Sequence, residues 1–131
     1  PRRVPCGAGT CDVVEATCVV HHVPINDRAN LMAEMRRCLK PRGLAFILEH
    51  NPFNPLTQLV VKRCEFDADA VLLTGSQSRS LMRRAGFDIV ATQYCSWLPS
   101  ASKWAKCVET MLGRVPLGAQ FAVVGRKEGD A

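Results

Sequence analysis

The sequence predicts an α/β fold with a largely parallel sheet, organised as one domain over residues 1–131. Three observations carry this prediction. The segment Asp12–Val20 is dense in β-branched residues, a charged segment with helical spacing follows it, and a second apolar run follows at Leu44–Leu48. A strand, a helix and a strand of these lengths make two parallel strands joined by a right-handed crossover. At 131 residues the chain is one domain at most.

Composition excludes several classes of protein. Hydrophobic residues make up 47% of the chain, which is ordinary for a globular domain, and no apolar run approaches the roughly 18 residues of a membrane span. No apolar segment follows Pro1–Cys6, so we expect no signal peptide, no membrane contact and a cytoplasmic location. The net charge of +5 is scattered and lacks an aromatic stacking motif, so we expect a basic solvated surface and no nucleic-acid binding.

The seven cysteines do not predict a disulfide framework or a zinc site. Their number is odd, no Cys-x-x-Cys occurs, and most of them lie within apolar patterns. A free cysteine in such a pattern behaves as a small apolar residue. We therefore expect reduced thiols, as in a cytosolic protein.

The first half of the chain contains the predicted strand–helix–strand unit. Gly7–Gly9 precedes a strand rather than following one, so it predicts a turn and not a phosphate-binding loop. Asn26 or Asp27 can cap the helix, and Lys40–Gly43 ends it. The apolar face of this helix consists of Leu31, Met35, Cys38 and Leu39.

The second half predicts further helices and strands. Thr74 and Gln77 match a capping box that opens a helix, and Gly86 is the expected left-handed terminator. Phe87–Cys95 alternates like a strand, and Gln120–Gly125 is a last strand that returns antiparallel beside it. The helix after Thr74 directs three apolar residues inward, namely Leu81, Met82 and Ala85.

Three further segments are less regular. Leu56–Val61 is apolar but of ambiguous type, Glu65–Asp69 is an acidic loop, and Ala70–Leu73 is either one helical turn or extended. A third helix is predicted over Ser102–Leu112. Its apolar positions recur at helical spacing and are expected to face the core: Trp104, Cys107, Val108, Met111 and Leu112.

Polar side chains follow both predicted parallel strands at their carboxyl ends. His21 and His22 follow the first strand, and Glu49, His50 and Asn51 follow the second. Open α/β sheets bind ligands just outside this edge. We therefore place the function there.

Structural interpretations of the same residues stay open. The His pair can cap backbone groups or pack on the following helix, and Glu49 with His50 can be a structural pair. Asn before Pro favours a turn, so a turn is the first interpretation of Asn51–Pro52 and Asn54–Pro55. A metal site built from the three histidines and Glu49 would lack any established ligand spacing, so we expect no metal.

Four segments occur in a characteristic order, namely Cys11–Val14, Val19–Val23, Glu34–Gly43 and Ala85–Phe87. Together they resemble the second half of class I S-adenosylmethionine-dependent methyltransferases, and the resemblance spans about Val4 to Arg126. Glu49–Pro52 and Pro116–Gln120 resemble a bacterial-type branch of that family which acts on small molecules. Cys11 and Arg42 depart from the pattern, because the family usually has an aromatic residue and a Gly there.

The resemblance implies a partial Rossmann-like methyltransferase sheet with flanking helices. Its strands would be equivalent to the family's fourth to seventh, with the last one antiparallel. The family's glycine-rich loop and ribose-binding acid would both lie before Pro1. We therefore expect residues 1–131 to form an incomplete methyltransferase domain that lacks the N-terminal, cofactor-binding half.

The resemblance also implies residue roles in methyl transfer from S-adenosylmethionine to a small-molecule acceptor. The enzyme mainly positions the acceptor and, when needed, takes its proton. The expected catalytic residues are His21, His22 and His50, since imidazole is a base near neutral pH. The residues expected to line the methionine part of the cofactor are Ala16, Thr17 and Cys18. The expected acceptor-binding residues are Glu49, Asn51 and Asn54.

A second class of function is a catalytically inactive remnant that acts as a binding or oligomerising module. Without preceding strands, Asp12–Val20 would be an open sheet edge, and such an edge invites pairing with another chain. This alternative predicts a homodimer formed through that strand.

Overall fold

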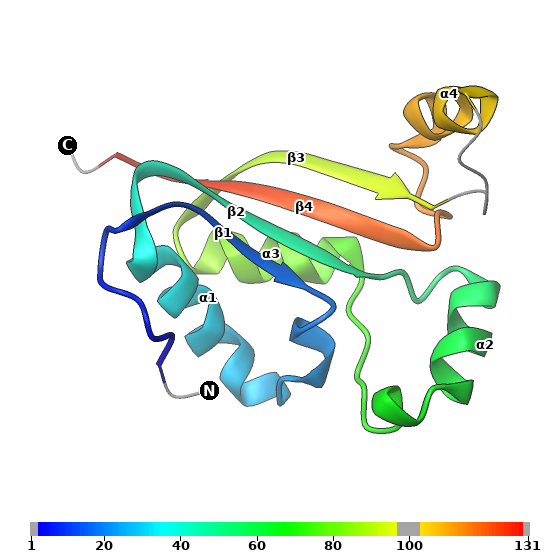
Figure 1. Cartoon of the computed structure of the whole chain (residues 1–131), viewed down its shortest axis with the longest axis horizontal. Coiled ribbons are helices and arrows are strands. Elements are labelled where there is room, and N and C mark those ends of the chain that lie inside the picture. Colours follow the sequence, from blue (N-terminus) through cyan, green and yellow to red (C-terminus); the bar gives the residue numbers. More distant parts are fainter. Residues whose placement is uncertain (1–2, 97–102, 130–131) are drawn as a thin grey trace.

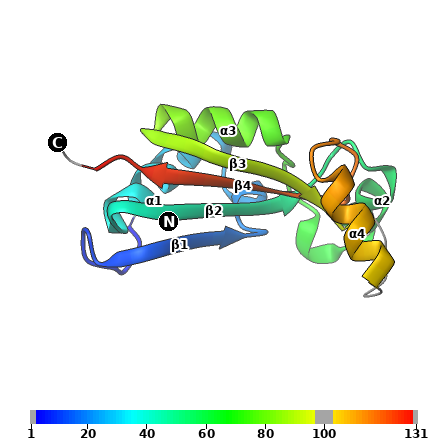
Figure 2. The same ribbon diagram turned by 90° about the horizontal axis from the view of Figure 1, so that it is seen from above.

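The chain folds into a four-stranded mixed sheet with flanking helices (Figure 1). The structure is a computed structural model that describes residues 3–96 and 103–129. The strands are β1 (Cys11–Thr17), β2 (Leu39–His50), β3 (Phe87–Cys95) and β4 (Gln120–Lys127). They lie side by side in the order β1-β2-β4-β3 (Figure 2).

The strand directions agree with the predicted partial Rossmann-like sheet. β1 pairs with β2 in parallel, and β4 runs antiparallel to both β2 and β3. The predicted α/β fold, the parallel first pair and the antiparallel last strand are therefore confirmed. Because β1 and β2 are parallel, their carboxyl ends lie at the same end of the sheet.

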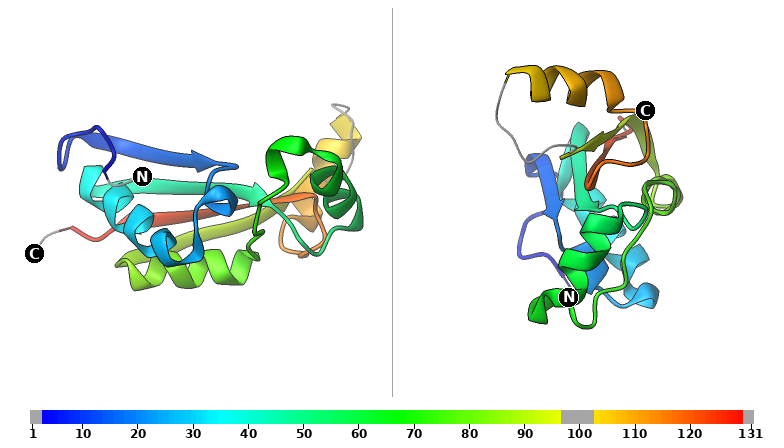
Figure 3. Two further views of the ribbon diagram at one scale, coloured as in Figure 1. Left: turned by 90° about the horizontal axis from the view of Figure 1, so that it is seen from below. Right: turned by 90° about the vertical axis from the view of Figure 1, so that its right-hand side faces the viewer.

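Four α-helices accompany the sheet within the described residues. They are α1 (Arg28–Cys38), α2 (Pro55–Arg63), α3 (Gly75–Arg84) and α4 (Lys103–Leu112). Short 3₁₀ turns are present at Val20–His22, Ile25–Asp27 and Glu65–Asp67. The helices α1 and α3 cover the same face of the sheet (Figure 3, left), whereas α2 and α4 lie beyond the carboxyl end of β2 (Figure 1). In the described part of the chain, every helix is too short or too polar to cross a membrane.

The core lies between the sheet and the pair α1 and α3. Alternate residues of β2 and β4 point toward these helices because side chains alternate along a strand. The residues that form the centre of this core are Met32, Met35, Ala45, Ile47, Met82, Phe121 and Val123. The predicted capping box at Thr74 and Gln77 opens α3, and Gly86 has the expected positive φ of 84°.

The first strand is shorter than predicted. It ends at Thr17 instead of Val20, because Cys18 adopts a left-handed conformation with φ of 50°. The chain then turns into the 3₁₀ segment that carries both histidines. The backbone N–H groups of Val19 and Val20 leave the sheet and donate to Glu49 at the end of β2. The β-branched residues predict a strand through Val20, but they carry no information about Glu49, the distant acceptor of these two N–H groups.

The second strand begins earlier than predicted, at Leu39 instead of Leu44. The pairing shifts from Cys11 with Leu39 to Val13 with Leu44, so the residues between them form an irregularity rather than a separate turn. Arg42 takes a positive φ of 64° within this irregularity.

The apolar segment 56–61, whose type was ambiguous from the sequence, is helical and lies within α2. Asn54 caps this helix, because its side chain accepts a hydrogen bond from Thr57 N at 3.0 Å.

The helix α4 does not contribute its apolar residues to the core as predicted. Trp104 is 62% exposed, Met111 is 77% exposed and Cys107 is exposed as well. The helix lies near the end of β3, on the side of the sheet opposite α1 (Figure 1; Figure 3, right). An amphipathic pattern predicts an apolar face but not which surface covers it. The predicted first residue, Ser102, and the Val108 side chain lie outside the described residues.

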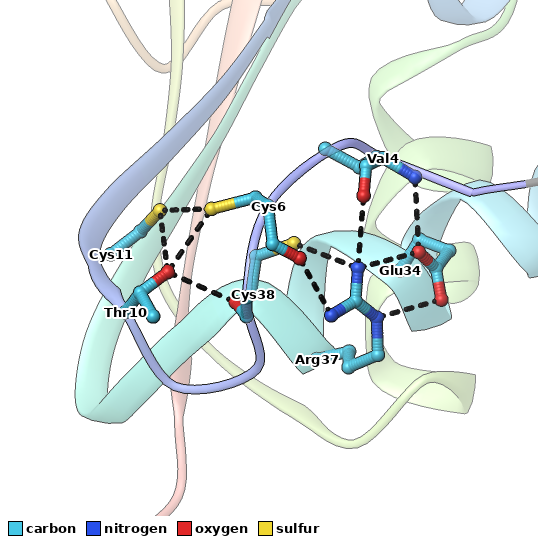
Figure 4. Close-up of polar contacts among 8 residues, drawn as sticks. Val4, Cys6, Thr10, Cys11, Glu34, Arg37 and Cys38 are labelled. Atoms are coloured by element: carbon cyan, nitrogen blue, oxygen red, sulfur yellow. Dashed lines mark hydrogen bonds and ion pairs between the residues drawn. The ribbon is translucent and has the colours of Figure 1, made fainter.

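The N-terminal loop is held against α1 by backbone hydrogen bonds to Glu34 and Arg37, which form an ion pair within that helix (Figure 4). Arg37 donates to both carboxylate oxygens of Glu34 and to the carbonyls of Val4 and Cys6. The hydrogen bond from Arg37 lowers the pKa of the Glu34 carboxyl. The seven cysteines form no disulfide in the described part of the chain, and the Cys6 sulfur lies 3.2 Å from the sulfur of Cys11, the first residue of β1.

Replacement of Met82 by Ala should destabilise the fold by about 2 to 5 kcal/mol, because Met82 is completely buried and its removal leaves a cavity. The matched variant Met111→Ala removes an exposed methionine and should change the free energy of unfolding by less than about 0.5 kcal/mol. Urea denaturation followed by circular dichroism measures both. Equal losses in the two variants would contradict the described position of α4.

The Glu34–Arg37 pair should make stability depend on pH. Because the pKa of Glu34 is lowered in the folded chain, its contribution is present above the ordinary carboxyl pKa and is lost as the pH falls through the folded value. The stability difference between the native chain and Glu34→Gln should therefore shrink between about pH 7 and about pH 3. Denaturation midpoints across this range test it, and a difference that grows on acidification would refute it.

Candidate functional site at the carboxyl edge of β1 and β2

The predicted polar clusters meet at one edge of the sheet. Cys18 N donates to Leu48 O at 2.8 Å, which keeps the two chain segments together just past the end of β1. Beyond this point His21 contacts Glu49, and the ring centroids of His21 and His50 lie 5.3 Å apart. The prediction that the two polar clusters lie close together is therefore confirmed.

Glu49 is the centre of this edge. Its side chain is fully buried, with 0% exposure. One carboxylate oxygen accepts from Val19 N at 3.1 Å and from Val20 N at 2.7 Å, and the other pairs with His21 Nδ1. Burial of an unpaired carboxylate is costly, so these three partners are what allow Glu49 to lie in the core.

His21 lies between two carboxylates. The ring is 1% exposed, with Nδ1 on Glu49 and Nε2 at 3.4 Å from Asp67 Oδ1. Among the residues that the structure describes, the Nε2 atom has no hydrogen-bond partner. His22, which is 42% exposed, also approaches Asp67 Oδ1 through its Nε2, at 3.3 Å. Its ring centroid is 4.1 Å from that of His21.

Asp67 is the site residue that the sequence analysis missed. It was grouped with the acidic loop Glu65–Asp69, because no local pattern links it to the histidines. Burial raises the pKa of Asp67, but the Cys64 thiol and the nearby imidazoles of His21 and His50 outweigh this, and the net pKa is lowered. Two hydrogen bonds hold the segment after Asp67 against His21 and α1. Val71 N donates to His21 O at 2.9 Å, and Arg28 of α1 donates to Val71 O at 2.6 Å.

His50 borders a small cavity on the side of α2. The cavity has a volume of about 230 Å³ and a mostly apolar lining. Its lining residues are His50, Leu56, Thr57, Val60, Ser96, Ala119 and Gln120. Two of these, Leu56 and Val60, are more than half exposed, so apolar surface continues outward from the cavity along α2.

The residues expected to line the cofactor lie at the end of β1. Ala16 is buried in the sheet, and Thr17 is exposed and donates to Glu15. Cys18 receives a weak contact from Gln120 Nε2 at 3.8 Å. Burial raises the pKa of the Cys18 thiol, and the nearby charges of Glu49 and Asp67 add to this effect. Cys18 is therefore a neutral thiol at the turn.

The expected acceptor residues Asn51 and Asn54 organise a turn. Asn51 is fully buried and donates to Pro116 O at 3.0 Å and to Gly118 O at 2.7 Å. Asn54 caps α2 and donates to Leu117 O at 2.8 Å. The structure thus brings both side chains to the loop before β4, and their contact with an acceptor stays a prediction.

Comparison with known proteins shows which folds this chain resembles. A family model described as "Methyltransferase domain" matches residues 2–47. A search of curated proteins found no match to the sequence. Solved structures match over nearly the whole chain, beginning with a SAM dependent methyltransferase from Archaeoglobus fulgidus, with a TM-score of 0.69 and 12% identity over 93% of this chain and 62% of that one.

Two further structures extend the comparison. A SAM-dependent methyltransferase from Thermotoga maritima, described as a possible histamine N-methyltransferase, has a TM-score of 0.72 and 18% identity over 97% of this chain and 61% of its own. The [4+2]-cyclase SpnF has a TM-score of 0.60 and 15% identity over 98% of this chain and 54% of its own. The chain spans about three fifths of the length of these structures.

These findings define the fold of the chain. The sheet and its helices form the class I S-adenosylmethionine-dependent methyltransferase fold, as the sequence resemblance implied. More particularly, the first third of the chain carries the sequence pattern of the methyltransferase domain family. The four strands correspond to the family's fourth to seventh, with the last antiparallel.

Replacement of Asn51 by Ala should destabilise the chain by roughly 2 kcal/mol or more, because the carbonyls of Pro116 and Gly118 would lose their donor. Asn30→Ala, on the exposed side of α1, is the matched control and should be nearly neutral. Chemical denaturation measures the difference. Equal stability of the two variants would show that Asn51 does not hold this turn.

Proposed function

We propose that the chain forms part of an S-adenosylmethionine-dependent methyltransferase that acts on a small-molecule acceptor bound at the carboxyl edge of β1 and β2. One observation carries the proposal: three imidazoles and a buried carboxylate gather at this edge of a methyltransferase fold. A cavity bordered by His50 opens beside them. Methyl transfer requires this combination of positioning and proton removal.

The three histidines would have different roles. His22 is 42% exposed and His50 borders the cavity, so both can reach a bound acceptor and take its proton. His21 is buried against Glu49 and would act mainly by holding the edge in position. Glu49, Asn51 and Asn54 would shape the acceptor side from the segment that follows β2.

The cofactor would lie at the end of β1. S-adenosylmethionine supplies the activated methyl group when it is bound. Ala16, Thr17 and Cys18 are small and lie where β1 ends and the chain turns at Cys18, which fits the methionine part of the cofactor. These residues fit only the methionine part of the cofactor, and no residue of this chain is assigned to its adenosine part.

The lining of the cavity suggests which part of the acceptor enters it. Leu56, Val60 and Ala119 offer apolar surface, while Thr57 and Gln120 offer a few polar groups. Small-molecule sites commonly combine these features. The proposed acceptor therefore has an apolar portion that binds along α2, next to the group that receives the methyl.

A second candidate function is oligomerisation through the edge of the sheet, as the sequence analysis left open. In the described part of the chain, β1 pairs on one side only, and Val13 is 54% exposed. Such an edge can pair with a second copy. A dimer measured by light scattering, and lost on Val13→Lys, would support this function, whereas a monodisperse monomer would refute it.

Methyl transfer should fail when the accessible histidines are removed. His22→Ala and His50→Ala should each lower kcat by about a hundredfold or more, since a proton acceptor is lost, while the Kd for S-adenosylmethionine stays unchanged. Asp88→Asn, exposed near the opposite end of the sheet, is the control and should keep native kcat. Normal kcat in both histidine variants would overturn the assignment of the base.

Cofactor binding is measured by titration calorimetry with S-adenosylmethionine. The titration uses this chain and, where the gene encodes residues before Pro1, the longer product. Binding by either supports the proposed function, and turnover is then measured on the form that binds. Absence of binding in both would remove the proposal.

A further inference from the structure

Three potential metal ligands converge where the 3₁₀ turn after β1 meets the segment after α2. They are the Nε2 atoms of His21 and His22 and a carboxylate oxygen of Asp67, and all three lie within 4.8 Å of one another. His21 and His22 lie in the 3₁₀ turn after β1, and Asp67 follows His22 by 45 residues in the sequence. The proposed function uses two of these residues but leaves their joint contact with Asp67 unexplained.

The hydrogen bonding of His21 leaves an unsatisfied atom at this point. Since Glu49 faces Nδ1, that nitrogen carries the proton and Nε2 is left with a lone pair in the neutral ring. This lone pair is buried, has no hydrogen-bond partner and faces Asp67 Oδ1 at 3.4 Å. Two electron-rich atoms at this distance are stabilised by a proton or a cation between them.

The distances fit a cation. Zinc bonds of about 2.0 to 2.1 Å at the tetrahedral angle separate neighbouring ligand atoms by about 3.3 Å. The two measured separations from Asp67 Oδ1 are 3.4 Å to His21 and 3.3 Å to His22. The wider separation between the two imidazole nitrogens can close by rotation of the exposed His22 side chain.

The surroundings of His21 complete the arrangement. Histidines that bind a metal commonly donate their second N–H to a carboxylate, which fixes the ring and raises the basicity of the ligand. Glu49 takes this position against Nδ1 of His21 and is itself held by Val19 N and Val20 N. The ligand ring is therefore oriented before any ion arrives.

We propose that His21, His22 and Asp67 form a divalent cation site of the zinc class, with Glu49 as the carboxylate that orients His21. Two imidazoles and one carboxylate leave a fourth position, which is the arrangement of catalytic rather than structural zinc. The exposure of His22 places this open position toward solvent. This site differs from the sequence-based expectation of no metal, because Asp67 was not recognised as a partner of the histidines.

An ion here would have a role in the proposed function, although the binding site itself does not depend on that function. A hydroxyl or water bound at the open position would become more acidic, as at other catalytic zinc sites. With His22 bound to the ion, the base would be His50, which lies near His21, remains outside the ligand set and could receive the proton that is released.

The test is metal binding by the whole chain with Zn²⁺ alone. After equilibrium dialysis and elemental analysis we expect one ion per chain, with an affinity that falls at least about tenfold in His22→Ala and in Asp67→Asn. Both side chains reach the surface, so these variants should fold, and circular dichroism confirms it. Asp69→Asn, an exposed acid two residues from Asp67, is the matched control and should bind like the native chain.

The thiols near Cys6 and Cys11 are the competing ligands, and a second control excludes them. The double variant Cys6→Ser/Cys11→Ser should keep the ion. Co²⁺ in the native chain should give visible bands of tetrahedral cobalt without the thiolate-to-metal absorption of a cysteine site. Loss of the ion in the cysteine variant, equal affinity in all variants, or no Zn²⁺ bound would overturn the proposal.

Discussion

The structure depends on a carboxylate that has no access to water. Glu49 is fully buried at the end of β2, where an unpaired charge would cost several kcal/mol. The N–H groups of Val19 and Val20 and the ring of His21 compensate it. These partners can reach Glu49 only if β1 stops at Thr17 and the chain turns over the end of the sheet. The position of the His pair therefore follows from satisfying one acid.

The same constraint draws in a part of the chain that is remote in sequence. Once His21 is fixed by Glu49, its carbonyl accepts from Val71 N, and Arg28 binds the Val71 carbonyl from α1. The turn that contains Asp67 is thereby held against both histidines. Two strands, one helix N-terminus and the segment between α2 and α3 are thus joined by a single polar network. The cavity beside His50 lies at the border of this network.

Local patterns predicted most of the elements, and distant contacts account for the errors. The capping box at Thr74, the terminator Gly86 and the strand Phe87–Cys95 are encoded by neighbouring residues, and each was predicted correctly. The convergence of His21 with Glu49 followed from parallel strands. Asp67 could not be predicted, because its partners lie 45 residues earlier in the chain. The exposure of α4 could not be predicted either, since helical spacing identifies an apolar face but not its covering surface.

The fold by itself does not determine the chemistry of this chain. Structures that match it over almost its whole length include methyltransferases and also a [4+2]-cyclase. One sheet can therefore support different reactions, and the groups at its carboxyl edge decide between them. Here those groups are three imidazoles, two carboxylates and an adjoining apolar cavity. In the proposed cation site, an ion between His21 Nε2 and Asp67 would set the chemistry of this edge together with His50 and the cavity.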